Sequence, residues 1–120
     1  MANFFRWLTN RATYRLAPGD LCSILSGMGT YGVVKVLVVE DDVVHVRLYR
    51  EKFPERPNRV AANSLTLGSI HEPGDHGVGH LPLSPATFRG WAPIKFQSEP
   101  VTDDELDGYR YWRGDGGGAW

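Results

Sequence analysis

The densest group of residues that could do chemistry is a short histidine-rich segment. Within ten residues it holds three imidazoles and two carboxylates, at His71, Glu72, Asp75, His76 and His80. Neutral imidazole and carboxylate are ordinary ligands of zinc and related divalent metals. The four- and three-residue gaps between the histidines match no established ligand motif, and interspersed glycines favour turns. A metal-dependent enzyme centred on His71, His76 and His80 is one interpretation, and a solvated polar loop is the other.

Residues that could act as nucleophiles are present, but none lies in a catalytic motif. Ser84 is followed by Pro85, the pattern of a helix N-cap with proline at the first helical position. Cys22 is the only cysteine and lies in an apolar run, so we expect it to be a small buried hydrophobe. The glycines over 27–32 precede an expected strand, whereas phosphate-binding loops lead into a helix. The sequence therefore predicts no catalysis and no cofactor.

Length and composition predict a single globular domain. The chain has 120 residues, of which 42% are hydrophobic and 22% charged, values typical of one folded domain. Thirteen basic and 14 acidic residues leave a net charge of −1, which disfavours nucleic acid as the partner because nucleic-acid binders usually carry a basic excess. A lone cysteine and no recognisable secretory signal predict a cytoplasmic protein. No apolar run is long enough to predict a transmembrane segment.

The elements that would position the candidate residues are mostly short strands. The clearest pattern is a hairpin, with a valine-rich strand over 31–40 and its partner over 43–50. In the second strand, apolar residues alternate with His45, Arg47 and Tyr49, which predicts one buried face and one partly exposed face. Strands are expected over 21–25, 31–40, 43–50, 65–70 and 94–97.

Helices are predicted at both ends of this β-rich region. Apolar and aromatic residues at helical spacing predict a helical extension over 1–17. Thr102 and Glu105 form a capping box for a C-terminal helix, on which Tyr109 and Trp112 are expected to pack against the sheet. The expected single domain, 1–120, comprises the N-terminal helical extension (1–17), a barrel-like core (18–98), and a C-terminal helix with a glycine-rich tail (99–120).

The N-terminal half of this core resembles a known class of small barrels. APGDLCSIL, a glycine-rich loop, YGVVKVLVV, an acidic turn and VVHVRLY are similar to the opening of SH3-like barrels of the Tudor and KOW type. In those barrels a Gly-Asp pair begins the first strand and a glycine lets the second strand bend. Gly19, Asp20 and Gly32 occupy these places. The fold implied is mainly β, either a small SH3-like β-barrel or a strongly bent antiparallel sheet of four or five strands.

The same arrangement is similar to that of small bacterial immunity proteins, which neutralise a partner toxin by covering it. That resemblance implies a non-catalytic binding protein whose partner is another protein, such as a toxin. A nucleic-acid or modified-peptide reader is the alternative, using the barrel face around Tyr31, Lys35, Arg47 and Tyr49. Tyrosine, tryptophan and arginine dominate interface hot spots. The predicted partner-binding residues are therefore Tyr31, Arg47, Tyr49, Tyr111 and Trp120.

Overall fold

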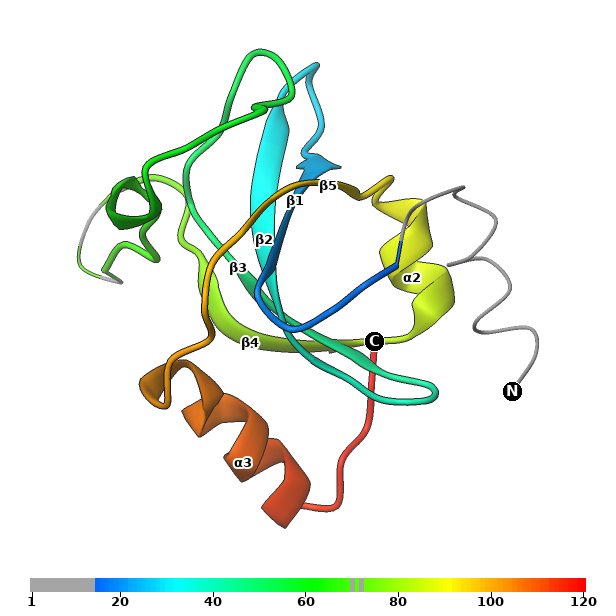
Figure 1. Cartoon of the computed structure of the whole chain (residues 1–120). Helices are drawn as coiled ribbons and strands as arrows, with labels where there is room; N and C mark the ends of the chain where they lie inside the picture. Colours follow the sequence, from blue (N-terminus) through cyan, green and yellow to red (C-terminus); the bar gives the residue numbers. More distant parts are fainter. Residues whose placement is uncertain (1–14, 70, 72) are drawn as a thin grey trace.

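The computed structural model describes residues 15–69, 71 and 73–120 (Figure 1). The predicted N-terminal helix lies outside the described residues except for 15–17, which are not helical. The strands are β1 (Asp20–Leu25), β2 (Tyr31–Val39), β3 (Val44–Leu48), β4 (Val78–Leu83) and β5 (Ile94–Ser98). The helical segments are the 3-10 turn η1 (Ala62–Ser64), α2 (Pro85–Gly90), the 3-10 turn η2 (Asp104–Leu106) and α3 (Asp107–Gly114).

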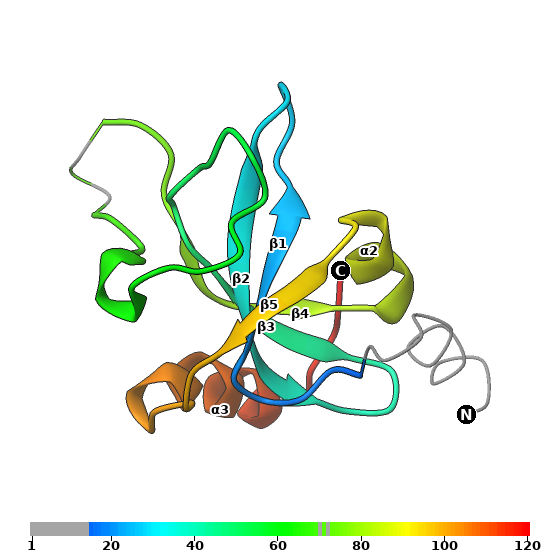
Figure 2. The same ribbon diagram turned by 45° about the horizontal axis from the view of Figure 1, so that its top comes forward.

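The described strands form one antiparallel sheet in the order β4-β3-β2-β1-β5 (Figures 1 and 2), which confirms the mainly β prediction. The edge strands β4 and β5 do not pair with each other in the described part of the chain, so the sheet is open rather than a closed barrel. The sheet is strongly bent, and three of its strand pairs contain a shift in register. Such bulges bend a strand and increase its local twist. The register shifts at Leu21/Cys22, Val36/Val38 and Val46/Leu48.

Both faces of the central hairpin are covered, which the strand alternation did not predict. One face forms the main core with Cys22 and with Phe88 of α2, both fully buried. The other face packs Tyr49 against Leu65 of the long segment that follows β3. On this second face His45 is also fully buried, because α3 lies over it. The expectation that His45 and Tyr49 would be partly exposed is therefore wrong.

The predicted strand over 65–70 is also wrong for 65–69, the part of it that the structure describes. Leu65 and Leu67 pack in the second core, but single backbone bonds replace a strand ladder there, and Gly68 has a φ of +73°. The fourth strand is instead β4, which begins in the glycine-containing segment expected to form turns and continues past it to Leu83. Gly79 and Pro82 weaken its strand pattern, and such residues are tolerated at the edge of a sheet.

Helix α2 begins at the predicted cap. The Ser84 hydroxyl oxygen accepts a hydrogen bond from the Thr87 backbone N–H at 3.2 Å. Replacing Ser84 with alanine is expected to lower the free energy of unfolding by about 1 kcal/mol, because that N–H loses its partner. Equilibrium urea denaturation checks this, with Ser64→Ala as control because the exposed Ser64 hydroxyl accepts from no helix N–H. Equal losses in the two variants would contradict the capping role.

The predicted fifth strand and C-terminal helix are confirmed. Strand β5 lies at an edge of the sheet, beside β1. The Glu105 carboxylate accepts from the Thr102 backbone N–H at 2.8 Å, which is one of the two bonds of the predicted capping box. The first turn is the 3-10 turn η2, so α3 itself begins at Asp107. Of the helices described, none is long and apolar enough to cross a membrane.

Candidate functional site

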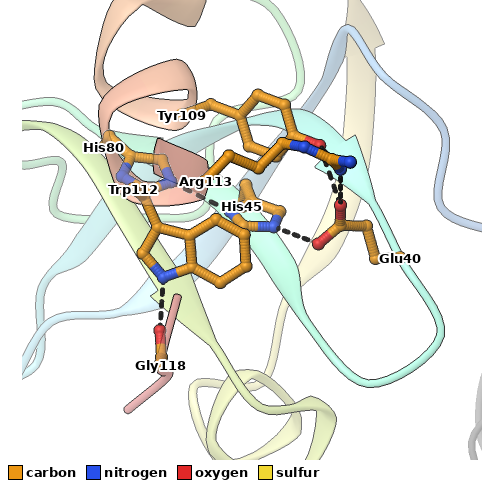
Figure 3. Close-up of polar contacts among 7 residues, drawn as sticks. All are labelled: Glu40, His45, His80, Tyr109, Trp112, Arg113 and Gly118. Carbon is orange, nitrogen blue, oxygen red and sulfur yellow. Dashed lines mark hydrogen bonds and ion pairs between the residues drawn. The ribbon is translucent and has the colours of Figure 1, made fainter. Parts of the chain in front are cut away.

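A chain of hydrogen bonds centred on two histidines lies between the sheet and α3 (Figure 3). His45 of β3 has no exposed surface. Its Nδ1 lies 2.9 Å from His80 Nε2, and its Nε2 lies 2.8 Å from Glu40 Oε1. A neutral imidazole has one donor and one acceptor. When His45 is neutral, Nε2 therefore donates to the carboxylate and Nδ1 accepts the proton of His80 Nε2.

Glu40 joins this histidine pair to α3. It follows β2, in the turn closed by the bond from Glu40 N–H to the Val43 carbonyl. Its Oε2 accepts from the Tyr109 hydroxyl at 2.8 Å and from Arg113 Nη1 at 3.3 Å. Burial alone would raise the pKa of Glu40, but the hydrogen bonds from His45 and Tyr109 outweigh it and hold the pKa below its ordinary value. We call Glu40, His45, His80, Tyr109 and Arg113 the histidine network.

Aromatic edges complete the contact between α3 and the sheet. Tyr109 and Trp112 pack on His45 as expected, with ring centroids 4.7 and 4.5 Å away and both pairs nearly perpendicular. The Trp112 indole N–H donates to the Gly118 carbonyl, which fixes the tail beside the ring (Figure 3). No residue of α3 is buried. The helix is thus held by polar bonds and ring edges, without the apolar seam that usually docks a helix.

A second feature on the same face of the sheet is a groove of about 470 Å³ beneath η2. Lys35, only 4% exposed, donates to the Pro100 carbonyl at 2.7 Å and to the Glu105 carboxylate at 2.9 and 3.2 Å. Burial would raise the pKa of Glu105, but the Thr102 N–H and Lys35 bring it below its ordinary value. The hydrogen bonds of the Lys35 ammonium therefore attach η2 to the sheet. The groove is lined by Leu21, Lys35, Arg47, Tyr49, Ala62, Asn63, Leu65, Glu99, Pro100, Thr102 and Glu105.

Two of the predicted partner-binding residues also line this groove. Burial, and next the Glu105 carboxylate, raise the pKa of Tyr49 to about 12, so its hydroxyl stays protonated. Arg47 makes one long hydrogen bond, 3.4 Å from Nη1 to the Gly79 carbonyl, and its Nε lies 4.0 Å from Glu105. Lys35, Arg47 and Tyr49 are three of the four residues named for a reader surface, and they line one groove.

The other predicted partner-binding residues lie elsewhere. Tyr31 is half-buried at the start of β2 beneath the Arg56 guanidinium, 4.9 Å from the ring centroid, and does not line the groove. Arg56 also donates to the Ser23 hydroxyl at 2.9 Å. Tyr111 and Trp120 are 78% and 73% exposed. The five residues therefore form no single surface.

The structure does not bring the three predicted metal ligands together. His71 and His76 are exposed in the segment before β4, whereas His80 lies on β4 against His45. Across residues 15–69, 71 and 73–120, no group of three or more histidine, cysteine, aspartate or glutamate side chains is placed to hold a metal. No pattern in the sequence pairs His80 with His45, which stands 35 residues earlier. The one feature of the sequence that could have indicated a buried polar group is the position of His45 within the valine-rich hairpin.

Comparison with models of protein families, with curated proteins and with solved structures gives no match for this chain.

Proposed function

We propose that the protein is a non-catalytic binding module of the SH3-like barrel type that acts as an immunity-type protein, covering the functional surface of a partner toxin. The strand order supports the fold, since consecutive strands pair and β5 returns beside β1. The Gly-Asp pair before β1 also supports it. Gly19 has a φ of +97°, and a Cβ there would lie 2.6 Å from the Glu99 carbonyl oxygen, while Asp20 is buried and accepts from the Ala17 N–H.

The observation that carries the functional proposal is the exposure of Tyr111 and Trp120. Large aromatic side chains gain most from burial and dominate interface hot spots. Tyr111 contributes to a shallow hollow of about 560 Å³ on the outer side of α3, together with charged side chains of both signs. This hollow suits a partner surface of mixed charge. Its lining residues are Asp107, Arg110, Tyr111, Gly114 and Asp115.

Trp120 is presented from a fixed backbone, although its side chain is exposed. Its N–H donates to the Pro82 carbonyl at 2.9 Å, and its carbonyl accepts from the Ser84 N–H at 2.8 Å. These two bonds attach the end of the tail to the end of β4. A contact residue that is already held in place loses less conformational entropy on binding. Trp120 is therefore suited to serve as a preorganised contact.

Alanine at Tyr111 or at Trp120 is expected to weaken partner binding about 30-fold or more, the effect of losing one hot spot. The tagged protein is used to capture partners from nuclease-treated bacterial lysate, and the protein retained near stoichiometry is identified by mass spectrometry. Its affinity is then measured for wild type, Y111A, W120A and the control M28A. Met28 is also fully exposed but lies in the turn after β1.

Loss of affinity in Y111A and W120A, with M28A unchanged, is the expected result. A wild-type protein that retains no protein near stoichiometry, that binds its partner no more tightly than Y111A and W120A do, or that turns over a substrate, would overturn the proposal. The second candidate, a modified-peptide reader, has one observation in its favour: Arg47 and Tyr49 line the same groove. Capture abolished by Arg47→Ala but insensitive to Y111A and W120A would select the reader instead.

A further inference from the structure

We propose that the histidine pair beneath α3 is an acid-operated latch, which accepts one added proton and releases α3 from the sheet when it must accept a second. The latch is defined by the contact between His45 Nδ1 and His80 Nε2, at 2.9 Å. Release of α3 is a property of the fold and needs no partner. Its consequence for binding rests on the proposed function.

The geometry limits how many protons the pair can hold. With both rings neutral, His80 Nε2–H donates to His45 Nδ1. With one added proton on the pair, a single N–H still lies between His45 Nδ1 and His80 Nε2, and His45 Nε2 still donates to Glu40. With two added protons, two N–H groups would face each other across 2.9 Å, with no acceptor between them. The buried His45 ring is held by Glu40, so His80 must move away.

The surrounding charges balance the first proton but not the second. Glu40, from the turn between β2 and β3, contacts His45 and is already shared with Tyr109 and Arg113 of α3. In the part of the chain that the structure describes, no carboxylate forms an ion pair with His80. From α3, the rings of Tyr109 and Trp112 and the uncharged Gly108 lie beside it. Beside it on the sheet, the cationic Arg47 of β3 donates to the Gly79 carbonyl.

The direction of the pH effect follows from these contacts. Burial, and next the charge on His45, lower the pKa of His80 below its ordinary value. The docked form therefore binds this proton less tightly than the released form. The free energy that holds α3 on the sheet is therefore greatest above the ordinary histidine pKa, about 6.5. It decreases as the pH falls below that value. The lowered pKa of Glu40 keeps that carboxylate charged through this range.

Helix α3 is the element that can leave. It has no buried residue, and its contacts with the sheet pass through Tyr109, Trp112 and the histidine network. Elements with few buried apolar contacts open at a lower free energy than the core. Release would free Tyr111 with the helix and break the bond from Trp112 to Gly118 that fixes the tail. A partner held by Tyr111 and Trp120 would then dissociate in mild acid.

The test follows the Trp112 indole N–H and the histidine ring signals of the full chain by NMR, from about pH 8 to about pH 5. We expect the Trp112 signal to move to a solvent-exposed value with the same midpoint as His80, and amide protection factors in α3 to fall about tenfold or more. In H80Q the amide can still donate to His45 Nδ1 but does not titrate, so the transition should disappear. H71Q, which removes an exposed histidine outside the network, should retain it.

A Trp112 signal that stays unchanged to about pH 5, or that moves without titration of His80, would overturn the latch. The same transition in H80Q would also overturn it. If H80Q does not fold, the wild type alone provides the test. A common midpoint for the Trp112 and His80 signals supports the latch, and separate midpoints overturn it. Captured partner is also measured across this pH range. A transition in the free protein, with no partner retained at neutral pH, would reject the proposed function and leave the latch standing.

Discussion

Replacing Glu105 with alanine is expected to lower the free energy of unfolding by about 3 to 5 kcal/mol at neutral pH, the usual cost of leaving a buried charge without its partner. The Lys35 ammonium would keep the Pro100 carbonyl as an acceptor but lose both carboxylate oxygens. Because Lys35 is only 4% exposed, its ammonium has little contact with water that could replace those bonds. Equilibrium urea denaturation of wild type and E105A measures the loss.

The matched control is Asp103→Ala, which removes one of the two carboxylate partners of Arg110, the other being Asp107. That ion pair is shorter, 2.6 Å, but both side chains are largely exposed, so its removal should leave stability nearly unchanged. In a double-mutant cycle, Lys35→Met added to E105A should recover much of the loss, because no buried charge remains. Equal losses in E105A and D103A, or no recovery in the double variant, would show that the buried pair does not hold η2.

The same contact is expected to weaken in acid. The pKa of Glu105 is held below its ordinary value by the Thr102 N–H and Lys35, although burial opposes them. A carboxyl group with a lowered pKa contributes its stability above the ordinary value and loses it as the pH falls below. This loss begins below the range in which the histidine latch is expected to open, since the ordinary carboxyl pKa is lower than that of histidine. Acid should therefore loosen α3 before it loosens η2.

Local patterns were sufficient to predict the parts of the fold that depend on neighbouring residues. The hairpin of β2 and β3, the cap at Ser84 and the helix after Thr102 are each set by a few consecutive residues. Strand β4 was missed because an edge strand accepts glycine and proline, which erase its pattern. The 65–70 segment was mistaken for a strand because leucines pack in a core whether or not their backbone joins a sheet.

The candidate site could not be predicted because its contacts join distant parts of the chain. Glu105 was identified as a helix cap, but its bond to Lys35, 70 residues away, is what attaches η2 to the sheet. Glu40 was assigned to the end of the strand over 31–40, and its bond to Tyr109 spans 69 residues. Alternation along β3 placed His45 on the correct face. It carried no sign that a later helix would cover that face and bury the ring.

Helix α3 packs so closely on β4 at Gly108 that no side chain fits at this position. A Cβ there would lie 2.5 Å from His80 Cβ and 3.2 Å from its Cγ. His80 Cβ is fixed by the backbone of β4, so the clash is relieved only if α3 moves outward. In Gly114, at the end of the same helix, an added Cβ meets no atom within 4 Å. Alanine at Gly108 therefore tests the close contact between α3 and His80, and alanine at Gly114 tests helix propensity alone.

Replacing Gly108 with alanine is expected to displace α3 at neutral pH, at a cost of about 1 to 3 kcal/mol for overpacking. The Trp112 indole signal should then resemble the one that the wild type reaches in acid. Gly114→Ala should keep the wild-type signal and raise the free energy of unfolding by less than about 0.5 kcal/mol, because Gly114 is the last residue of the helix and gains only part of the advantage that alanine has in a helix interior. NMR of the indole N–H and urea denaturation measure both effects. An unchanged Trp112 signal in G108A would mean that α3 does not lie in close contact with His80. Movement of His80 could then not release the helix.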